Sequence, residues 1–141
     1  MPHSPHEGKA AFKEILICGK DYSEIAQKRQ SLHDLLNIPF ISLTDGTATH
    51  DSHHQYFFDN HLKFAPDIEA ATTDQIIPMV IHNLGIGFCP EKLAKPFIES
   101  GNILQIPLIE SELEREICLI QDISRGTSIA VSKLINMLIE D

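Results

Sequence analysis

One stretch, residues 72–90, limits what this chain can fold into more than any other part of the sequence. It opens with three residues of the kind that cap helices, Thr72, Thr73 and Asp74. Each can accept a hydrogen bond from the free N–H groups of a helix start. Apolar residues follow at spacings of one, three and four, namely Ile76, Ile77, Val80, Ile81 and Leu84. This spacing predicts a helix with one buried face.

Pro78 and Gly85 bear on the limits of that helix. A proline deep inside a helix removes a donor and clashes with the preceding turn. The helix is therefore expected to start near Asp74 or Gln75, so that Pro78 lies close to its first turn. Gly85 is expected to end the helix by adopting a positive φ. Residues 86–89, Ile-Gly-Phe-Cys, then predict a short strand buried on both faces, which Pro90 stops.

Predicted strands and helices alternate along the rest of the chain. Strands are predicted at residues 14–18, 40–43, 67–70, 86–89, 103–106 and 115–121, and helices at about 31–37, 51–63, 74–84, 91–99 and 127–140. Alternation on a scale of about 20–30 residues predicts right-handed βαβ units and a mostly parallel sheet, which is an α/β fold. In the helix at 51–63 the expected core anchors are Phe57, Phe58, His61 and Leu62. Residues 1–12 are expected to form a loose tail, with residues 13–141 as one domain.

The composition argues against several classes of protein. A net charge of −9 without a cluster of Lys and Arg argues against nucleic-acid binding by this chain. No apolar run approaches the roughly 20 residues of a membrane span. The N-terminus lacks the apolar core of a secretion signal, so a cytoplasmic protein is expected. Cys18, Cys89 and Cys118 lie in apolar runs without the spacing of a disulfide framework or a zinc site, and we interpret them as small buried hydrophobes.

The candidate binding site lies where two predicted strands end. In an open α/β sheet, ligands bind at the carboxyl ends of strands, where loops and helix N-termini converge. Two such loops carry hydroxyls, a glycine and free N–H groups, and their candidate ligand-binding residues are Thr44, Asp45, Gly46, Thr47, Thr72 and Thr73. Unpaired donors at a helix start favour an anion such as a carboxylate. The alternative, that these threonines only cap helices and turns, stays open at this stage.

The sequence carries no catalytic signature and no complete metal site. It has no Gly-x-Ser-x-Gly, and Gly85-Ile-Gly87 follows a helix, whereas a dinucleotide fingerprint follows a strand. His50 and His54 are four residues apart and could share a helix face with a metal. A second Cys or His pair is missing, so exposed helix histidines are the default expectation. We therefore predict no cofactor, no metal and no catalytic residue.

Several segments together resemble the effector-binding domain of LysR-type transcriptional regulators. They are residues 15–21 (ILICGKD), 31–41 (SLHDLLNIPFI), 84–90 (LGIGFCP) and 115–121 (REICLIQ), and they occur in the family's order. The resemblance implies a three-layer, Rossmann-like lobe of the type 2 periplasmic-binding-protein-like fold. The segments match mostly the second lobe, the returning crossover strand and the C-terminal helix. The resemblance also implies a homo-oligomeric, non-enzymatic sensor whose small-molecule effector binds after the strands at 40–43 and 67–70, where the candidate residues lie.

The family's winged helix-turn-helix, its linker helix and most of its first lobe have no counterpart in this sequence. The chain is therefore expected to be a partial domain that reaches DNA only through a helix-turn-helix domain absent from it. Its uncovered strand edges and apolar helix faces are expected to self-associate. Two other hypotheses stay open, a stand-alone solute-binding module and a small α/β enzyme. The enzyme would need a base beside the hydroxyls of the two loops.

Overall fold

The computed structural model describes the backbone of residues 7–120 and the side chains of residues 11–116, and it contains one six-stranded mixed sheet. The strands are β1 (Glu7–Cys18), β2 (Phe40–Leu43), β3 (Ile68–Ala70), β4 (Ile86–Pro90), β5 (Leu104–Gln105) and β6 (Leu113–Ile120). Their order is β3-β2-β4-β1-β5, and β6 pairs with β1 off this path. β2 is parallel to β3 and β4, whereas β1 is antiparallel to β4, β5 and β6.

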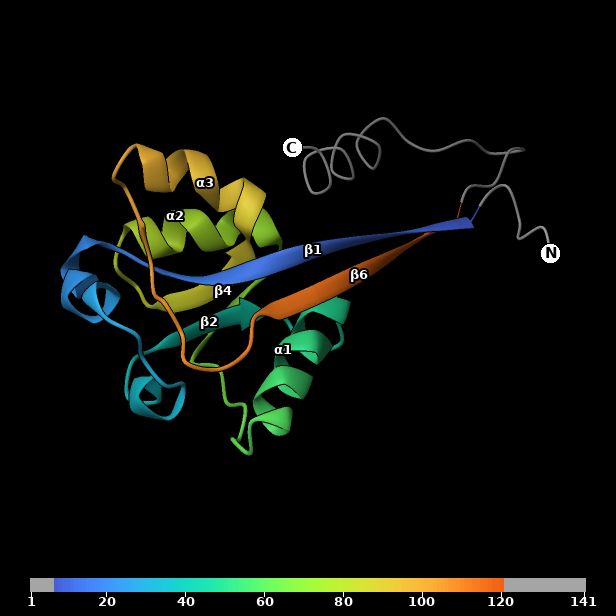
Figure 1. Cartoon of the computed structure of the whole chain (residues 1–141), viewed down its shortest axis with the longest axis horizontal. Helices are drawn as coiled ribbons and strands as arrows, with labels where there is room; N and C mark the ends of the chain where they lie inside the picture. The colour runs from blue at the N-terminus through green and yellow to red at the C-terminus, as the bar shows by residue number, and fades with distance from the viewer. Residues whose placement is uncertain (1–6, 121–141) are drawn as a thin grey trace.

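Helices cover both faces of this sheet. The α-helices are α1 (Ala48–Asp59), α2 (Ile76–Ile81) and α3 (Glu91–Glu99), and the 3-10 helices are η1 (Lys20–Gln27), η2 (His33–Leu35) and η3 (Thr73–Gln75). α2 and α3 lie over one face, and α1 lies over the other (Figure 1). The fold is therefore the three-layer α/β arrangement that the resemblance implies. The mostly parallel sheet that the sequence pattern predicts is found at the centre, in β3-β2-β4, whereas all three pairings of β1 are antiparallel. Among the described residues, none of the helices has the length and hydropathy needed to cross a membrane.

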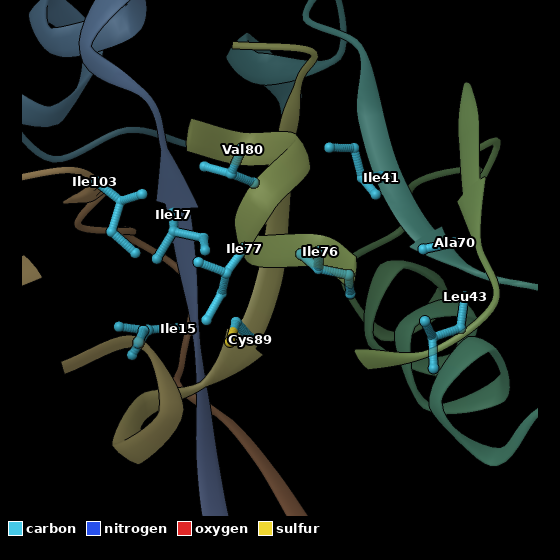
Figure 2. Close-up of a cluster of buried hydrophobic side chains, with 11 residues drawn as sticks. Ile15, Ile17, Ile41, Leu43, Ala70, Ile76, Ile77, Val80, Cys89 and Ile103 are labelled. Atoms are coloured by element: carbon cyan, nitrogen blue, oxygen red, sulfur yellow. The ribbon is translucent and has the colours of Figure 1, made fainter. Parts of the chain in front are cut away.

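The alternation of side chains along the strands produces two separate cores. Ile15 and Ile17 of β1 point toward α2 and α3, whereas Leu16 and Cys18 point toward α1. The aliphatic core comprises Ile15, Ile17, Ile41, Leu43, Ala70, Ile76, Ile77, Val80, Cys89, Ala94 and Ile103 (Figure 2). The aromatic core comprises Leu16, Cys18, Leu32, Leu35, Phe40, Tyr56, Phe57, Ile86, Phe88, Ile106 and Leu113.

The first strand is longer than the sequence pattern predicts. Glu14 pairs with Pro90 of β4 and also with Leu113 of β6, and residues 7–13 continue beyond the sheet, paired with β6 alone. The two strands form a ribbon that extends away from the helices (Figure 1). Residues 7–12 therefore lie in β1 and not in a loose tail, because their hydrogen-bond partners come from a strand about 100 residues later in the chain, which no local pattern reveals. The rest of the expected tail, residues 1–6, and the helix expected at 127–140 lie outside the described residues.

The helix expected at 74–84 is shorter than predicted and ends differently. It consists of η3 followed by α2, which ends at Ile81, and Pro78 lies in the first turn of α2 as expected. The left-handed residue after the helix is Asn83 (φ 61°), so the expectation of a positive φ at Gly85 was wrong. A Cβ at Gly85 would lie 2.5 Å from the Pro39 carbonyl oxygen, so glycine is needed there for close backbone approach. Leu84, expected on the buried face, is 50% exposed because the helix has already ended.

The remaining predicted helices are found, and all but one of them have shifted ends. α3 has the predicted bounds, and Gly101 follows it with φ 84°. The helix expected at 31–37 is only the three-residue η2. α1 starts and ends a few residues earlier than predicted. Among its expected anchors Phe57 is buried, but Phe58 is 66% exposed and His61 lies beyond the helix with φ 62°.

Candidate functional site

The two candidate loops lie at the same edge of the sheet. β2 and β3 are parallel neighbours, with Leu43 opposite Ala70 as the last pair. Directly after it, the Thr44 backbone N–H donates to the Ala70 carbonyl oxygen at 3.2 Å, and the Thr44 hydroxyl lies 3.3 Å from the same oxygen. The loops after residues 43 and 70 are therefore held side by side.

The first loop is a turn that starts α1. Gly46 has φ 96°, a conformation that favours glycine. Both the backbone N–H and the hydroxyl of Thr47 donate to the Thr44 carbonyl oxygen, at 3.2 Å and 2.8 Å. The Thr47 hydroxyl also accepts from the His50 backbone N–H at 3.1 Å, as an N-cap does. The capping interpretation is therefore correct for Thr47.

The threonine at the corresponding position of the second loop makes no such hydrogen bond. Thr72 is the N-cap residue of η3, but its side chain makes no capping hydrogen bond. Instead the Gln75 side-chain oxygen accepts from the Ala71 backbone N–H at 2.9 Å, and the Thr72 carbonyl accepts from the Gln75 backbone N–H at 3.1 Å. The capping interpretation does not hold for the Thr72 hydroxyl.

Together the two loops form an open rim beyond the strand ends. Four of its members are exposed, namely Thr44, Asp45, Gly46 and Thr72, and Thr47 and Thr73 are half-buried. The exposed residues carry two threonine hydroxyl groups and one carboxylate. Such a rim can hydrogen-bond one side of a small polar molecule, and a second surface would be needed to enclose it.

Beneath this rim lies a buried polar network that sequence reasoning missed. Ser42, the residue before Leu43, has its hydroxyl 2.9 Å from His53 Nδ1. His53 Nε2 lies 2.8 Å from Glu14 Oε1. In the tautomer that donates from Nε2 to the Glu14 carboxylate, Nδ1 of the imidazole accepts from the Ser42 hydroxyl. Ser42 and His53 are 0% exposed and Glu14 is 3% exposed.

Arg115 completes the network from the returning strand β6. Its Nη1 donates to the Thr49 hydroxyl at 2.8 Å and lies 3.7 Å from Glu14 Oε2. The network thus joins β1, β2, α1 and β6. Although Ser42, His53 and Glu14 are aligned like a hydrolase triad, a fully buried serine hydroxyl cannot reach a substrate. The geometry of the network is suited to holding α1 and the base of the first loop against the sheet.

The helix period was the signal that could have identified His53. Thr49, His53, Tyr56 and Phe57 are the buried residues of α1, at the spacing of one helix face. The default expectation of exposed helix histidines was therefore wrong for His53.

Within the described part of the chain, the residues best placed to hold a metal differ from the pair that the spacing suggested. The ligand atoms of Asp45, His50 and Asp51 lie within 4.8 Å of one another. His50 Nδ1 is buried without a hydrogen-bond partner, 3.6 Å from Asp45 Oδ1 and 4.0 Å from Asp51 Oδ1. His54, the other histidine of that pair, is not in this group. Both carboxylates are exposed, and exposed acidic groups of this kind also occur without a metal.

The cysteines whose side chains are described behave as buried hydrophobes, as expected. Burial raises the pKa of the Cys18 thiol to about 11. Burial, with a smaller contribution from the Glu14 charge, raises the pKa of the Cys89 thiol to about 12. Both thiols are protonated at neutral pH and are poor nucleophiles. The side chain of Cys118 lies outside the described residues.

Comparison with known proteins gives one family and many similar folds. The LysR substrate binding domain family matches residues 12–141. The regulatory domain of MetR, a LysR family regulator from N. meningitidis, superposes with a TM-score of 0.64 at 15% identity, covering 98% of this chain and 65% of that chain. The effector binding domain of QuiR in complex with shikimate gives a TM-score of 0.67 at 12% identity, covering 99% and 66%.

A third similar structure is the CcmR regulatory domain of Synechocystis PCC6803 in complex with 2-PG, with a TM-score of 0.66 at 12% identity, covering 99% and 68% of the two chains. At these identities the superpositions establish a shared fold. The chain spans about two thirds of the length of these domains. Comparison with curated protein sequences finds no match.

Proposed function

This chain belongs to the LysR substrate-binding domain family, and we propose that it senses a small-molecule effector at the rim formed by Thr44, Asp45, Gly46, Thr47, Thr72 and Thr73. The observation that carries the proposal is the contact between Thr44 and Ala70. It brings both loops to the carboxyl ends of adjacent parallel strands, where open α/β sheets bind ligands.

The chemistry of the rim favours an effector with a carboxylate. The Thr72 hydroxyl is not used for capping, and the first loop ends at the N-terminus of the 12-residue helix α1. Unpaired N–H groups and the helix dipole favour negative charge at such a position. Shikimate, bound in the QuiR domain, is a carboxylate with hydroxyl groups, which supports this choice.

The output of the sensor is proposed to pass through contacts between subunits. With a net charge of −9, this chain is a poor DNA-binding surface, so DNA contact would come from a helix-turn-helix domain of a cytoplasmic regulator. The ribbon of β1 and β6 extends beyond the sheet, and such ribbons tend to acquire a partner. Size-exclusion chromatography with light scattering checks this point. A monomer at all accessible concentrations would contradict self-association.

The effector proposal is tested by a thermal-shift screen with hydroxylated carboxylates, followed by titration calorimetry. Thr72→Val removes a hydroxyl without changing side-chain volume and is expected to weaken a binding compound by roughly 0.5–1.5 kcal/mol, the net value of one hydrogen bond. Ser23→Ala is the matched control, because it removes a hydroxyl from η1, at the amino end of the parallel strands. Equal losses in both variants, or hits that bind Thr72→Val unchanged, would contradict a site at this rim.

The enzyme hypothesis has one supporting feature, the aligned Ser42, His53 and Glu14. The sequence analysis required a base beside the loop hydroxyls, and the structure puts His53 beside a buried serine instead. We therefore propose a non-catalytic role for this network. Hydrolysis of an activated ester that is lost in Ser42→Ala would contradict it.

A further inference from the structure

A cavity lies at the opposite end of the parallel strands from the rim. It has a volume of about 210 Å³ and is lined by Phe40 and Ile86, the first residues of β2 and β4, and by Asp67, the residue before β3. Because β2 is parallel to β3 and β4, this is the amino end of all three strands. The candidate rim is at their carboxyl end, so the two places are distinct.

The inner wall of this cavity is apolar and buried. It is formed by Leu16, Leu32, Leu35, Phe40, Phe57 and Ile86, which are all members of the aromatic core. Three rings stand around it, since Phe40 makes edge contacts with Phe57 and Phe64 at centroid distances of 5.3 Å and 5.8 Å, and Phe57 lies 5.0 Å from Phe64. Aromatic side chains attract a further ring in edge-to-face or offset geometry.

The mouth of the cavity carries opposite charges. Its exposed lining residues are Leu36, Lys63, Ala65 and Asp67. The Asp67 carboxylate accepts from the Phe40 backbone N–H at 2.9 Å. One ammonium and one carboxylate give the mouth no net charge, and the apolar wall offers no partner to an ionic group, whose burial there would cost its hydration.

From its size, lining and charge balance, we propose that this cavity binds an uncharged molecule with a single aromatic ring. An apolar cavity of about 150 Å³ lined by Leu, Ile and Phe side chains is known to stay dry and to bind benzene. A volume of 210 Å³ leaves room for a ring with a small substituent. The ligand enters past Leu36 and Lys63 and packs against Leu35, Phe40 and Phe57. This site does not depend on effector binding at the rim.

Methyl NMR on the full chain tests the proposal, with toluene and phenol as probes. Saturable shifts are expected for the methyl groups of Leu32, Leu35 and Ile86. The methyl groups of Ile77 and Val80, in the aliphatic core on the other face of the sheet, are expected to stay unchanged. Shifts that rise linearly to the solubility limit of toluene, or that appear equally in both cores, would overturn the proposal.

A matched pair of variants locates the site without disturbing the buried wall. Leu36 and Leu84 are similarly exposed, at 47% and 50%, but only Leu36 lines the cavity. Leu36→Trp is expected to weaken toluene binding by roughly tenfold or more, whereas Leu84→Trp leaves it unchanged. Equal affinity in both variants would overturn the location.

Charged analogues test the class of ligand. Benzoate and benzylamine are expected to bind more weakly than toluene, because burying either charged group against the apolar wall costs its hydration. Benzoate binding tighter than toluene, with the preference lost in Lys63→Met, would replace the uncharged class by a carboxylate and overturn the proposal.

Discussion

The two faces of the sheet are built from different side chains. The face under α2 and α3 is packed by aliphatic residues and Cys89 (Figure 2). The face under α1 holds the aromatic cluster, the cavity and the four buried polar residues of the described part of the chain, Glu14, Ser42, Thr49 and His53. The first face gains stability from close packing alone, whereas the second depends on hydrogen bonds that must all be satisfied.

The reason for this difference is the two-residue period of the strands. Glu14 shares a face with Leu16 and Cys18, and Ser42 shares a face with Phe40, so both polar side chains point toward α1. His53 comes from α1 itself to meet them. Among the described residues, polar side chains are therefore buried in one layer only. Substitutions in the two layers should destabilise the fold for different reasons.

The largest effect is expected from breaking the polar network. Glu14→Ala leaves His53 without its acceptor and the half-buried Arg115 without its nearby carboxylate, and it should lower the free energy of unfolding by about 3–5 kcal/mol. Glu112→Ala is the control, because the Glu112 carboxylate pairs with Lys13 at the surface, where ion pairs contribute about 0–1 kcal/mol. Urea denaturation measures both. A similar small loss in the two variants would show that the network does not stabilise the fold.

A smaller loss of stability is expected from changes in packing, and its size should differ between the two cores. Ile76→Val removes one methylene from the filled aliphatic core, and Ile86→Val removes one from the wall of the cavity. Ile→Val changes cost about 0.5–1.5 kcal/mol, and Ile76→Val should lie near the upper end because its methyl group has neighbours on all sides. Ile86→Val should lie near the lower end. Chemical denaturation that ranks them in the opposite order would contradict an open cavity.

The smallest effect concerns the two buried thiols, one in each core. Their folded pKa values, about 11 for Cys18 and about 12 for Cys89, lie above the ordinary value of 9.0. A raised pKa means that each thiol stays protonated to a higher pH in the folded chain than in the unfolded chain. The free energy of unfolding therefore has its full value below pH 9.0 and falls as the pH rises from 9.0 through 11 to 12. The Tyr56 hydroxyl, whose pKa burial raises to about 12, acts in the same direction.

Denaturation midpoints should therefore fall as the pH rises above 9.0, and the fall should be smaller in Cys18→Ala and in Cys89→Ala. Ellman's reagent at neutral pH should react with these thiols only as fast as the chain opens. Rapid labelling of either thiol in the folded chain would contradict its burial.

The sequence predicted the bounds of a helix or strand correctly where residues close together in the chain determine them. The bounds of α3 and the buried strand β4 follow from their own apolar spacing and their flanking Pro and Gly residues. The sequence also predicted that the two candidate loops lie together, because parallel strands end at the same edge of a sheet. The helix at 74–84 was predicted too long because its end depends on Asn83, whose side-chain oxygen accepts from the Asp21 backbone N–H.

The sequence by itself therefore determined the α/β class, the family resemblance and the position of the polar rim. Each of these rests on periodicity or on residues close together in the chain. Only the tertiary structure decided that Ser42, His53 and Glu14 meet, that β1 continues to Glu7 beside β6, and that a cavity opens beside Phe40. These features join segments tens of residues apart, and their energies depend on burial and distance, which no single segment encodes.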